Sequence, residues 1–584
     1  MRVIATAGHV DHGKSTLLRA LTGMEPDRWE EERRRGLTID LGFVWSGDLA
    51  FVDVPGHERF ITNMLAGVGP VPAVLLVVAA DEGWQVQTQE HLDIVDALGI
   101  RHGLLVVTRS DLADPAPALA EAAEKVAGTG LEGAPALAVS AVTGDGIEPL
   151  RAALSRLAAA LPGSGDQDDV RIWADRVFTV EGRGTVVTGT LGAGTISVGD
   201  TLQVPEGTVR IRGLHSLQTP RDQVTGPARV ALNVRGDTAG LRRGAALVTP
   251  GCWLTTVTAD VRLRPPGASP AAPPDRIPRT MTWHIGAAAV PAQVRRLDDR
   301  HARITLAEGL PLRVGDRALL RDPGSRRIWG ADVLDVRPPR LGRRGAARQR
   351  AEELRGMDAT PDGAAELRRR GLIRHTDLVA MGARPPEKAV RAGEWLVDPD
   401  HWSALKDRLM KTLTAHAAAH PQDPGLPAET VRQALGLPDR ALVAALAAQT
   451  RLRHARGRLT MAAPALPPET ARRVAALRRD LEQEPFAAPT AERLEALGLR
   501  SRDLAAAEAA GLLVRLAPGV VLRPGALEDA AEILAGLPQP FTAAQARQAL
   551  RSTRRVVIPL LEHLDRLGRT RRQDDSLRQV VRRA

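Results

Sequence analysis

The amino-acid sequence predicts a multidomain protein: a doubly wound α/β domain, two small β-barrels, and an array of repeated helix-and-hairpin modules. Three observations predict this fold class. Strand and helix signals alternate over residues 1–162, which is typical of a parallel sheet covered by helices. Short β runs with Gly and Pro turns follow from Arg171 to about Pro339, as in small barrels. Beyond residue 345, a unit recurs about every sixty residues, which indicates an array.

The first domain opens with a short apolar strand at 3–5, the segment Gly-His-Val-Asp-His-Gly-Lys-Ser at 8–15, and a helix-like run at 17–21. This is G-x-x-x-x-G-K-S in strand–loop–helix context, the phosphate-binding P-loop. Backbone N–H groups and the helix N-terminus can surround phosphate oxygens there. Lys14 is expected to reach the β- and γ-phosphates, and Ser15 to bind Mg²⁺. The expected nucleotide contacts of this loop are Val10, Asp11, His12, Gly13, Lys14, Ser15 and Thr16.

Three further positions suit the metal and the terminal phosphate. Asp53 lies at the end of an apolar strand, where a carboxylate can hold the Mg²⁺ shell through water. Gly56 leaves its N–H free to approach a γ-phosphate. Thr38, which lies between the P-loop and Asp53, can supply a second hydroxyl to Mg²⁺. The sequence therefore predicts a magnesium site made by Ser15, Thr38 and Asp53, the aspartate acting through water.

A base-binding loop is predicted after the next two strands. The segment Thr108-Arg109-Ser110-Asp111 follows the strand at 103–107. The Asp111 carboxylate can accept from both N1–H and the 2-amino group of guanine, a pair of donors that adenine does not offer. Ser140 and Ala141 follow another strand and fit a loop that closes over the base. We expect Thr108, Arg109, Asp111, Ser140 and Ala141 to bind guanine.

The P-loop, the segments of the metal site and the base-binding segments occur in an order and at a spacing that resemble translational GTPases of the elongation factor Tu family. The resemblance rests on the P-loop, on Arg-Gly-Leu-Thr-Ile at 35–39 and on Asp-Val-Pro-Gly-His at 53–57. It implies an α/β P-loop GTPase domain that uses GTP/GDP and Mg²⁺. It also implies that His57 positions the attacking water, and that Val10 and Leu37 form an apolar gate that holds this histidine back until the ribosome acts.

One position departs from the family's pattern. The family usually has Asn/Thr-Lys-x-Asp in the base-binding loop, whereas this chain has Arg109 where the lysine stands. An arginine stem can pack along the P-loop in a similar way, but arginine and lysine are not interchangeable. We expect guanine preference to survive through Asp111.

Composition limits the class of protein. Cys252 is the single cysteine, which excludes intramolecular disulfides and Cys-rich zinc sites. No run of eighteen apolar residues occurs, so no membrane span or membrane partner is expected. Arg2 directly precedes the first strand, which does not fit a removable signal peptide, and a cytoplasmic monomer is expected. The net charge of +10 favours a polyanionic partner, although arginine-rich, Ala/Pro/Gly-rich composition also indicates high-GC codon usage.

The domain boundaries follow from changes in pattern. A Pro/Gly/Ser linker closes the first domain and a basic segment at 341–345 precedes the array. The β runs at 175–200 and 315–322 resemble the second and third domains of the elongation factor Tu family. The predicted domains are 1–166 (GTP-binding), 167–252 (β-barrel II), 253–340 (β-barrel III), and winged helices at 345–400, 401–466, 467–527 and 528–584.

The repeats carry the signature of winged helices. Copies at 428–435, 490–497 and 542–550 each begin with a short helix that is followed by a second helix and a β-hairpin. This is a winged helix, a variant of helix-turn-helix. A degenerate first copy is predicted around 366–373. The alternative is a set of generic helical repeats that bind protein.

A GTPase of this type with a C-terminal winged-helix array resembles the family of bacterial selenocysteine-specific elongation factors. The resemblance covers the whole chain and is specific in residues 1–160, in 171–235 and in the last stretch, 558–572. It implies that the protein carries selenocysteinyl-tRNA as a GTP complex. The last winged helix would hold an mRNA hairpin beside an in-frame UGA codon, and the ribosome would trigger GTP hydrolysis.

The same resemblance implies an amino-acid pocket in the second domain. That family uses an aspartate and two arginines, and Asp175, Arg176 and Arg229 stand at the matching positions. A selenol is an anion at neutral pH, and guanidinium groups favour it over a neutral serine hydroxyl through charge-assisted hydrogen bonds. The alternative is that Asp175 and Arg176 form a surface ion pair.

Two arginine pairs are candidates for mRNA binding. Arg554 and Arg555 stand where the turn of the last module meets its second helix, and Arg571 and Arg572 lie at the start of its wing. A helix N-terminus and arginines together suit phosphate, and RNA hairpins are read by phosphate contacts plus a splayed base. The alternative is a solvated charge pair at each place.

Two other functions stay open on the sequence. One is a translational GTPase that delivers ordinary aminoacyl- or initiator tRNA, which would lack the four winged modules. The other is a GTP-switched regulator whose winged helices bind DNA, and the predicted pair of barrels argues against it.

Overall fold

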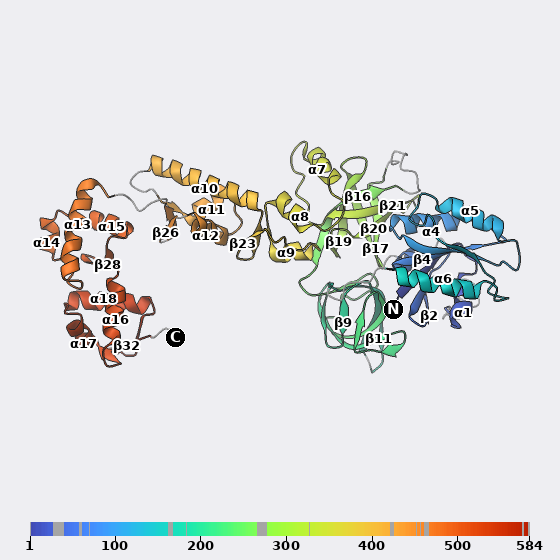
Figure 1. Cartoon of the computed structure of the whole chain (residues 1–584), viewed down its shortest axis with the longest axis horizontal. Helices are drawn as coiled ribbons and strands as arrows, with labels where there is room; N and C mark the ends of the chain where they lie inside the picture. The colour runs from blue at the N-terminus through green and yellow to red at the C-terminus, as the bar shows by residue number, and fades with distance from the viewer. Residues whose placement is uncertain are drawn as a thin grey trace. The chain divides into compact units, whose positions relative to one another are not determined.

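The structure, a computed structural model, describes residues 2–26, 40–57, 61–68, 71–161, 168–182, 184–265, 277–325, 327–420, 425–450, 452–455, 457–460, 466–574 and 577–581. The chain divides into two compact units, residues 1–389 and 390–584, which are described separately below (Figure 1). None of the helices in the described ranges has the length and apolarity that a membrane crossing requires.

The first unit begins with a six-stranded sheet in the order β2-β3-β1-β4-β5-β6. Its strands are β1 (Arg2–Ala7), β2 (Gly42–Ser46), β3 (Leu49–Asp53), β4 (Ala73–Ala79), β5 (His102–Thr108) and β6 (Ala136–Ala138). All neighbours pair in parallel except β2, which is antiparallel to β3. Every residue of the apolar strand β4 is buried, as expected for a parallel strand covered on both faces.

Helices pack on this sheet: α1 (Lys14–Thr22), α3 (Ile61–Val68), α4 (Val86–Ala97), α5 (Ala116–Val126) and α6 (Ile147–Ala160). Strand β1 lies between β3 and β4, so the chain leaves β1 toward one side of the sheet and later returns on its other side. Ligands of open α/β sheets bind beyond the carboxyl ends of strands at such a reversal. The topology therefore brings the P-loop, which follows β1, to the expected binding edge.

A closed six-stranded barrel follows, because β10 pairs with both β15 and β11 and so joins the ends of the order β10-β15-β7-β8-β14-β11. Burial alternates along β14, as it must when one face of a strand points into a barrel. The elements are β7 (Arg171–Val180), β8 (Gly184–Leu191), β9 (Thr195–Ser197), β10 (Thr201–Val204), β11 (Gly207–Ser216), β12 (Thr219–Pro220), β13 (Gln223–Thr225), β14 (Ala228–Gly236) and β15 (Ala246–Val248).

A second closed barrel has the strand order β16-β19-β18-β17-β20-β21. Its strands are β16 (Leu254–Arg264), β17 (Thr280–Ile285), β18 (Ala288–Arg296), β19 (His301–Leu312), β20 (Arg317–Arg321) and β21 (Ile328–Asp335). The unit continues with α7 (Ala346–Arg355), α8 (Gly363–Arg370), β22 (Leu372–Arg374) and α9 (His375–Ala380). Helix α7 is fastened to this barrel by Arg350, which is buried and donates to Asp260 of β16 and Asp335 of β21.

The second unit begins with the hairpin β23 (Val390–Ala392) and β24 (Trp395–Val397) and contains three helix-and-hairpin modules. The first module comprises α10 (Pro399–Ala419), β25 (Leu426–Pro427), α11 (Ala428–Leu435), α12 (Arg440–Gln449), β26 (Arg453–Ala455) and β27 (Arg458–Thr460). The second comprises α13 (Pro468–Gln483), α14 (Ala491–Ala496), α15 (Ser501–Ala509), β28 (Val514–Ala517) and β29 (Val520–Leu522). The third comprises α16 (Ala526–Ala535), β30 (Phe541–Thr542), α17 (Ala543–Ala549), α18 (Arg554–Arg566), β31 (Thr570–Arg572) and β32 (Leu577–Val580).

The predicted fold class is confirmed: an α/β domain, two six-stranded barrels and a C-terminal winged-helix region. Each of the three repeats has the expected pair of helices and hairpin, and an additional helix (α10, α13 or α16) precedes each pair. The predicted first copy at 345–400 extends across the division between the two units at 389/390. The predicted boundaries of the individual domains stay a prediction.

The last two modules share one hydrophobic core. Buried side chains from α13 to α18 form a single cluster that includes Phe486 and Phe541. Polar contacts join the modules as well: the Ser552 hydroxyl donates to the carbonyl of Phe486, and Arg555 Nη2 donates to the carbonyl of Gly519 at 2.8 Å. The two modules therefore form one packed body.

Candidate functional site

The P-loop is held by α4, a helix that the sequence motifs do not include. The N–H of Gly8 donates to Nδ1 of His91 at 2.9 Å, and the N–H of Val10 donates to Oε1 of Gln87 at 3.3 Å. Gly8 has φ +135°, and a Cβ there would lie 2.2 Å from the carbonyl oxygen of Val77. Only glycine fits this position, because the loop passes directly over β4.

Lys14 lies inside the loop, where its Nζ donates to the carbonyl oxygens of Gly8 at 3.1 Å and His9 at 2.6 Å. The side chain is buried. The ammonium group is thus already directed to the concave side of the loop, where a nucleotide's phosphates would compete for it.

Ser15 and Asp53 meet at the predicted metal site. The Ser15 hydroxyl donates to Oδ2 of Asp53 at 2.6 Å, and the Thr6 hydroxyl donates to Oδ1 of the same carboxylate at 2.9 Å. A hydroxyl beside an oriented carboxylate is an oxygen donor set of the kind that Mg²⁺ prefers. Two of the three predicted metal residues are therefore together, while Thr38, like the gate residue Leu37, lies outside the described residues.

The segment that carries His57 packs against the P-loop. A Cβ on Gly56 would lie 2.5 Å from both the backbone nitrogen of Val10 and Nζ of Lys14, so glycine is required for the close approach. His57 is the next residue and is half-buried. The structure thus brings the predicted catalytic histidine next to the loop that contains Val10.

The predicted base loop is tied to the P-loop through Thr108, whose hydroxyl donates to the carbonyl of His12 at 2.7 Å. Arg109 has φ +56° and turns back over the P-loop. Its Nη1 pairs with Asp81 at 2.9 Å and Glu82 at 2.8 Å, and its Nη2 donates to the carbonyl of Asp11. The arginine therefore packs along the P-loop, as expected for the residue that replaces the family's lysine.

Asp111 and the second base segment lie at the same edge of the sheet. The carboxylate of Asp111 is exposed. Ser140 is buried, and its hydroxyl accepts from the N–H of Thr143 at 3.1 Å. The N–H of Ser110 donates to the carbonyl of Val139 at 3.3 Å, so the loops that contain Asp111 and Ala141 are neighbours.

His12 of the P-loop and His91 beside it are held neutral. Burial, with a contribution from the charge of Lys14, lowers the pKa of His91 to about 3. Burial, followed by the charge of His9, lowers the pKa of His12 to about 4. A neutral His91 is required here, because its Nδ1 must accept the hydrogen bond from Gly8. Sequence reasoning missed His91 and Gln87, because most residues of α4 are polar and their spacing of four does not distinguish these two from the others.

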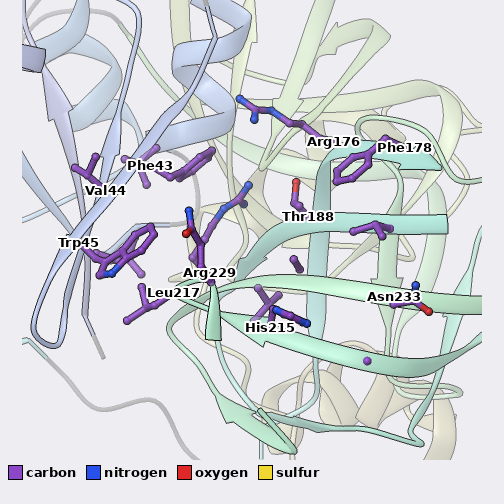
Figure 2. Close-up of a pocket in the computed structure, with 18 of the residues that line it drawn as sticks. Phe43, Val44, Trp45, Arg176, Phe178, Thr188, His215, Leu217, Arg229 and Asn233 are labelled. Atoms are coloured by element: carbon purple, nitrogen blue, oxygen red, sulfur yellow. The ribbon is translucent and has the colours of Figure 1, made fainter. Parts of the chain in front are cut away.

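A cavity of about 650 Å³ lies between the GTPase domain and the first barrel. Strands β2 and β3 form one wall, and β7, β8, β11 and β14 form the other (Figure 2). The labelled side chains around it are Phe43, Val44, Trp45, Arg176, Phe178, Thr188, His215, Leu217, Arg229 and Asn233. Both predicted pocket arginines therefore line one cavity, together with two aromatic side chains from β2 that sequence reasoning missed.

The predicted aspartate of this pocket is placed by a β-bulge. The register of β7 against β8 shifts between Ala174 and Arg176, so Asp175 is the extra residue, and bulges re-aim side chains in this way. Asp175 is buried and accepts from the Thr188 hydroxyl at 2.6 Å and from Arg229 Nη2 at 2.7 Å. Nη1 of Arg229 also donates to Asp175, which makes the pair bidentate.

Arg176 has different partners. Its Nη2 pairs with Asp40 at 2.8 Å and donates to the carbonyl of Leu41 at 2.8 Å. The alternative of a surface ion pair between Asp175 and Arg176 is therefore wrong, since Asp175 pairs with Arg229 and each arginine contacts a separate segment.

The candidate mRNA residues divide into two kinds. Arg554 and Arg555, at the start of α18, and Arg571 and Arg572, in β31, are all exposed. Arg555 donates to the carbonyl oxygens of Pro489 at 3.1 Å and Gly519 at 2.8 Å, which belong to the preceding module. Arg555 thus joins two modules.

Comparison with known families gives two matches. Residues 1–160 match the elongation factor Tu GTP binding domain. Residues 532–578 match the winged helix of elongation factor SelB. These segments contain the P-loop site and the last winged module, respectively.

Individual relatives match over much of the chain. The selenocysteine-specific elongation factor of Escherichia coli (strain K12) is 34% identical over 468 residues, which are 76% of this chain and 74% of the relative. That of Haemophilus influenzae is 32% identical over 72% of this chain and 70% of the relative. The crystal structure of a bacterial selenocysteine-specific elongation factor matches over all of both chains, with a TM-score of 0.74 and 25% identity. A translational GTPase domain and a SelB-type winged helix in one chain of this length agree with these relatives, and the chain belongs to the family of selenocysteine-specific elongation factors.

Proposed function

We propose that this GTPase binds selenocysteinyl-tRNA in its GTP form and delivers it to the ribosome at in-frame UGA codons. An mRNA hairpin held by the C-terminal winged helices would mark those codons, and the ribosome would stimulate GTP hydrolysis. The observation that carries the proposal is Arg229, which lines a cavity beside the GTPase domain and forms a bidentate pair with the buried Asp175.

The pocket suits a selenol better than a hydroxyl for an electrostatic reason. A selenolate is an anion at neutral pH, and the side chain of serine is neutral. Arg229 is only 13% exposed, so water screens its charge weakly and a hydrogen bond to an anion gains strength. Asp175 engages part of the guanidinium, which fixes its plane and leaves further N–H donors for a ligand.

The residues at the nucleotide site fit GTP with Mg²⁺. Ser15, Asp53 and Thr38 would hold the ion, which supplies positive charge to the β- and γ-phosphates when it is bound. Lys14 binds the phosphates, Asp111 reads guanine, and His57 orients the attacking water. Val10 and Leu37 would keep His57 from this position until the ribosome acts.

At the C-terminal end, Arg554, Arg571 and Arg572 are proposed to contact the phosphates of the hairpin. Their exposure supports this role, and the α18 N-terminus adds a positive end. Arg555 is proposed to act mainly by holding the last two modules together, because its donors reach carbonyls of the neighbouring module.

The test compares the dissociation constants of selenocysteinyl-tRNA and seryl-tRNA of the same body, with GTP bound. Arg229→Ala and Arg176→Ala should each weaken the selenocysteinyl complex about tenfold or more and leave the seryl complex nearly unchanged. Arg212→Ala is the matched control, since Arg212 lines the same cavity but is exposed to water, whereas Arg176 and Arg229 are largely shielded from it. Equal losses for both tRNAs would contradict the pocket.

A further inference from the structure

The amino-acid pocket has a wall that belongs to the GTPase domain. The ring of Phe43, on β2, lies 3.9 Å from the guanidinium carbon of Arg229 and 5.7 Å from that of Arg176 (Figure 2). The shorter distance is that of a stacked cation–π contact. One aromatic side chain of the GTPase domain therefore covers the guanidinium that the barrel presents.

The contacts of Arg229 complement one another geometrically. Asp175 accepts from two N–H groups of Arg229, and a bidentate carboxylate lies in the plane of the guanidinium. Phe43 contacts the same group from the GTPase domain, because the guanidinium carbon lies over its ring, 3.9 Å from the centroid. The carboxylate and the ring thus both restrict the movement of the guanidinium.

We propose that Phe43 is a specificity-determining positioning residue: by covering Arg229, it keeps the guanidinium poorly hydrated and directs its remaining donors at the amino-acid side chain. This inference rests on the proposed selenocysteine pocket. A less hydrated cation separates an anionic selenolate from a neutral hydroxyl more strongly, since charge interactions grow as the local dielectric falls. Phe43 does not need to touch the amino acid to have this effect.

The other arginine is held by the same segment of chain. Arg176 pairs with Asp40 and donates to the carbonyl of Leu41. Residues 40–43 therefore contact both arginines of the pocket. The barrel supplies the guanidinium groups, and the GTPase domain sets their orientation.

This segment is also directly connected to the nucleotide site. In the antiparallel ladder of β2 and β3, Gly42 is opposite Asp53 and Phe43 is opposite Val52. Asp53 is the carboxylate that accepts from Ser15. The aromatic wall of the pocket is therefore one residue along the ladder from a residue of the predicted metal site.

The experiment measures equilibrium dissociation constants of the full chain with GTP for selenocysteinyl-tRNA and seryl-tRNA of the same body. Phe43→Leu keeps an apolar side chain without a ring, and it should weaken the selenocysteinyl complex about fivefold and the seryl complex less than about twofold. Phe43→Tyr keeps the ring face and should restore the difference. Phe178→Leu is the matched control: Phe178 lines the same cavity, and no stacking on an arginine is found for it among the described residues.

Each variant must bind GTP as the unchanged chain does, which establishes that the GTPase domain is folded. The inference is overturned if Phe43→Leu leaves the ratio of the two dissociation constants unchanged, which includes an equal weakening of both complexes. It is also overturned if Phe178→Leu reduces the preference for selenocysteinyl-tRNA as much as Phe43→Leu does. A double variant, Phe43→Leu with Arg229→Ala, should be no less selective than Arg229→Ala alone, because Phe43 acts only through Arg229. Additive losses would also overturn the inference.

Arg229→Ala alone separates the inference from the proposed function. If Arg229→Ala leaves the selenocysteine preference intact, the proposed pocket itself is wrong. If Arg229→Ala removes the preference but Phe43→Leu does not, the pocket stands and only the role of Phe43 is wrong.

Discussion

Nη2 of Arg350 lies 2.6 Å from Oδ2 of Asp335, and both side chains are buried between α7 and the second barrel. Burial alone would raise the pKa of Asp335, but the charges of Arg370, Arg369 and Arg350 hold it below its ordinary value. The interface between the barrel and the α7–α8 helices is therefore ionic, with several buried charges that depend on one another.

Replacing Arg350 should destabilise this interface strongly. Arg350→Met removes one shared partner of two buried carboxylates, Asp335 and Asp260. Both carboxylates keep other arginine partners, so the loss should be that of hydrogen bonds to charged groups, about 1.5–3 kcal/mol. Denaturant unfolding of the intact chain measures the loss. Arg348→Met is the control, because Arg348 is 89% exposed and the ion pair that it forms with Glu352 at 3.7 Å is on the surface. This variant should change the free energy of unfolding by less than about 0.5 kcal/mol. Equal effects of the two variants would contradict this account.

His57→Ala should slow ribosome-stimulated GTP hydrolysis by about a hundred- to ten-thousand-fold and leave the GTP dissociation constant nearly unchanged. A group that orients water acts in the transition state and contributes little to nucleotide binding. Single-turnover hydrolysis with programmed ribosomes provides the rate. His102→Ala, at the start of β5, should keep normal turnover. Full stimulated hydrolysis by His57→Ala would exclude His57 from this role.

Asp111→Asn should weaken GTP binding about ten- to a hundredfold and permit xanthosine triphosphate to bind. The amide places a donor where the carboxylate had an acceptor, which matches the carbonyl that xanthine carries instead of the amino group. Competition binding with both nucleotides tests the exchange. Asp114→Asn, an exposed residue a few positions further on, should have no effect. Unchanged preference for GTP in Asp111→Asn would show that another group reads the base.

His91 should make the GTPase domain less stable in acid. Its folded pKa of about 3 is below its unfolded value of 6.5, so the unfolded state binds the proton first. Its contribution is therefore complete above pH 6.5 and is lost as the pH falls from 6.5 toward 3, by about 2 kcal/mol at pH 5. His91→Gln can still accept from Gly8 but does not titrate. The unfolding transition of the GTPase domain can be identified because bound GDP shifts it. This transition should depend less on pH in His91→Gln than in the unchanged chain. An unchanged pH dependence would be incompatible with a neutral His91.

Arg554→Ala should weaken hairpin binding by residues 467–584 and flatten the plot of log K against log salt by about one unit, for one lost phosphate contact. Its melting temperature should not change, since Arg554 is exposed. Arg555→Ala should instead lower the melting temperature, because Arg555 donates to Pro489 and Gly519. An unchanged salt slope in Arg554→Ala would place the hairpin elsewhere.

Most of the fold could be predicted from local sequence patterns. The P-loop, the alternation of strand and helix, and the helix-helix-hairpin repeats depend on residues that are close in sequence. The helices before each repeat were not predicted. The apolar residues of α13 and α16 lie on the faces of these helices that pack into the shared core. Such an apolar face belongs to no recognisable sequence motif, so the sequence did not distinguish these helices.

The sites could be predicted where the residues that bind the ligand are themselves part of a sequence motif. Asp53 and Ser15 meet as expected. The contacts of Phe43 with Arg229 and of His91 with Gly8 join segments far apart in the chain, and no local pattern encodes such contacts. The role of Asp175 also depends on a bulge, which a strand pattern does not reveal.

The core shared by the last two modules has a consequence for synthesis. A ribosome releases the chain from its N-terminus, so the module of α13–α15 emerges before the helix α18 that packs on its strand β28. Its apolar surface stays uncovered until Leu560 and Leu564 have left the exit tunnel. Folding of this region therefore requires α18 to have emerged, and transiently exposed apolar surface makes such a region prone to aggregation and a target for chaperones. A chain terminated before α18 would present this surface permanently and would be prone to aggregation.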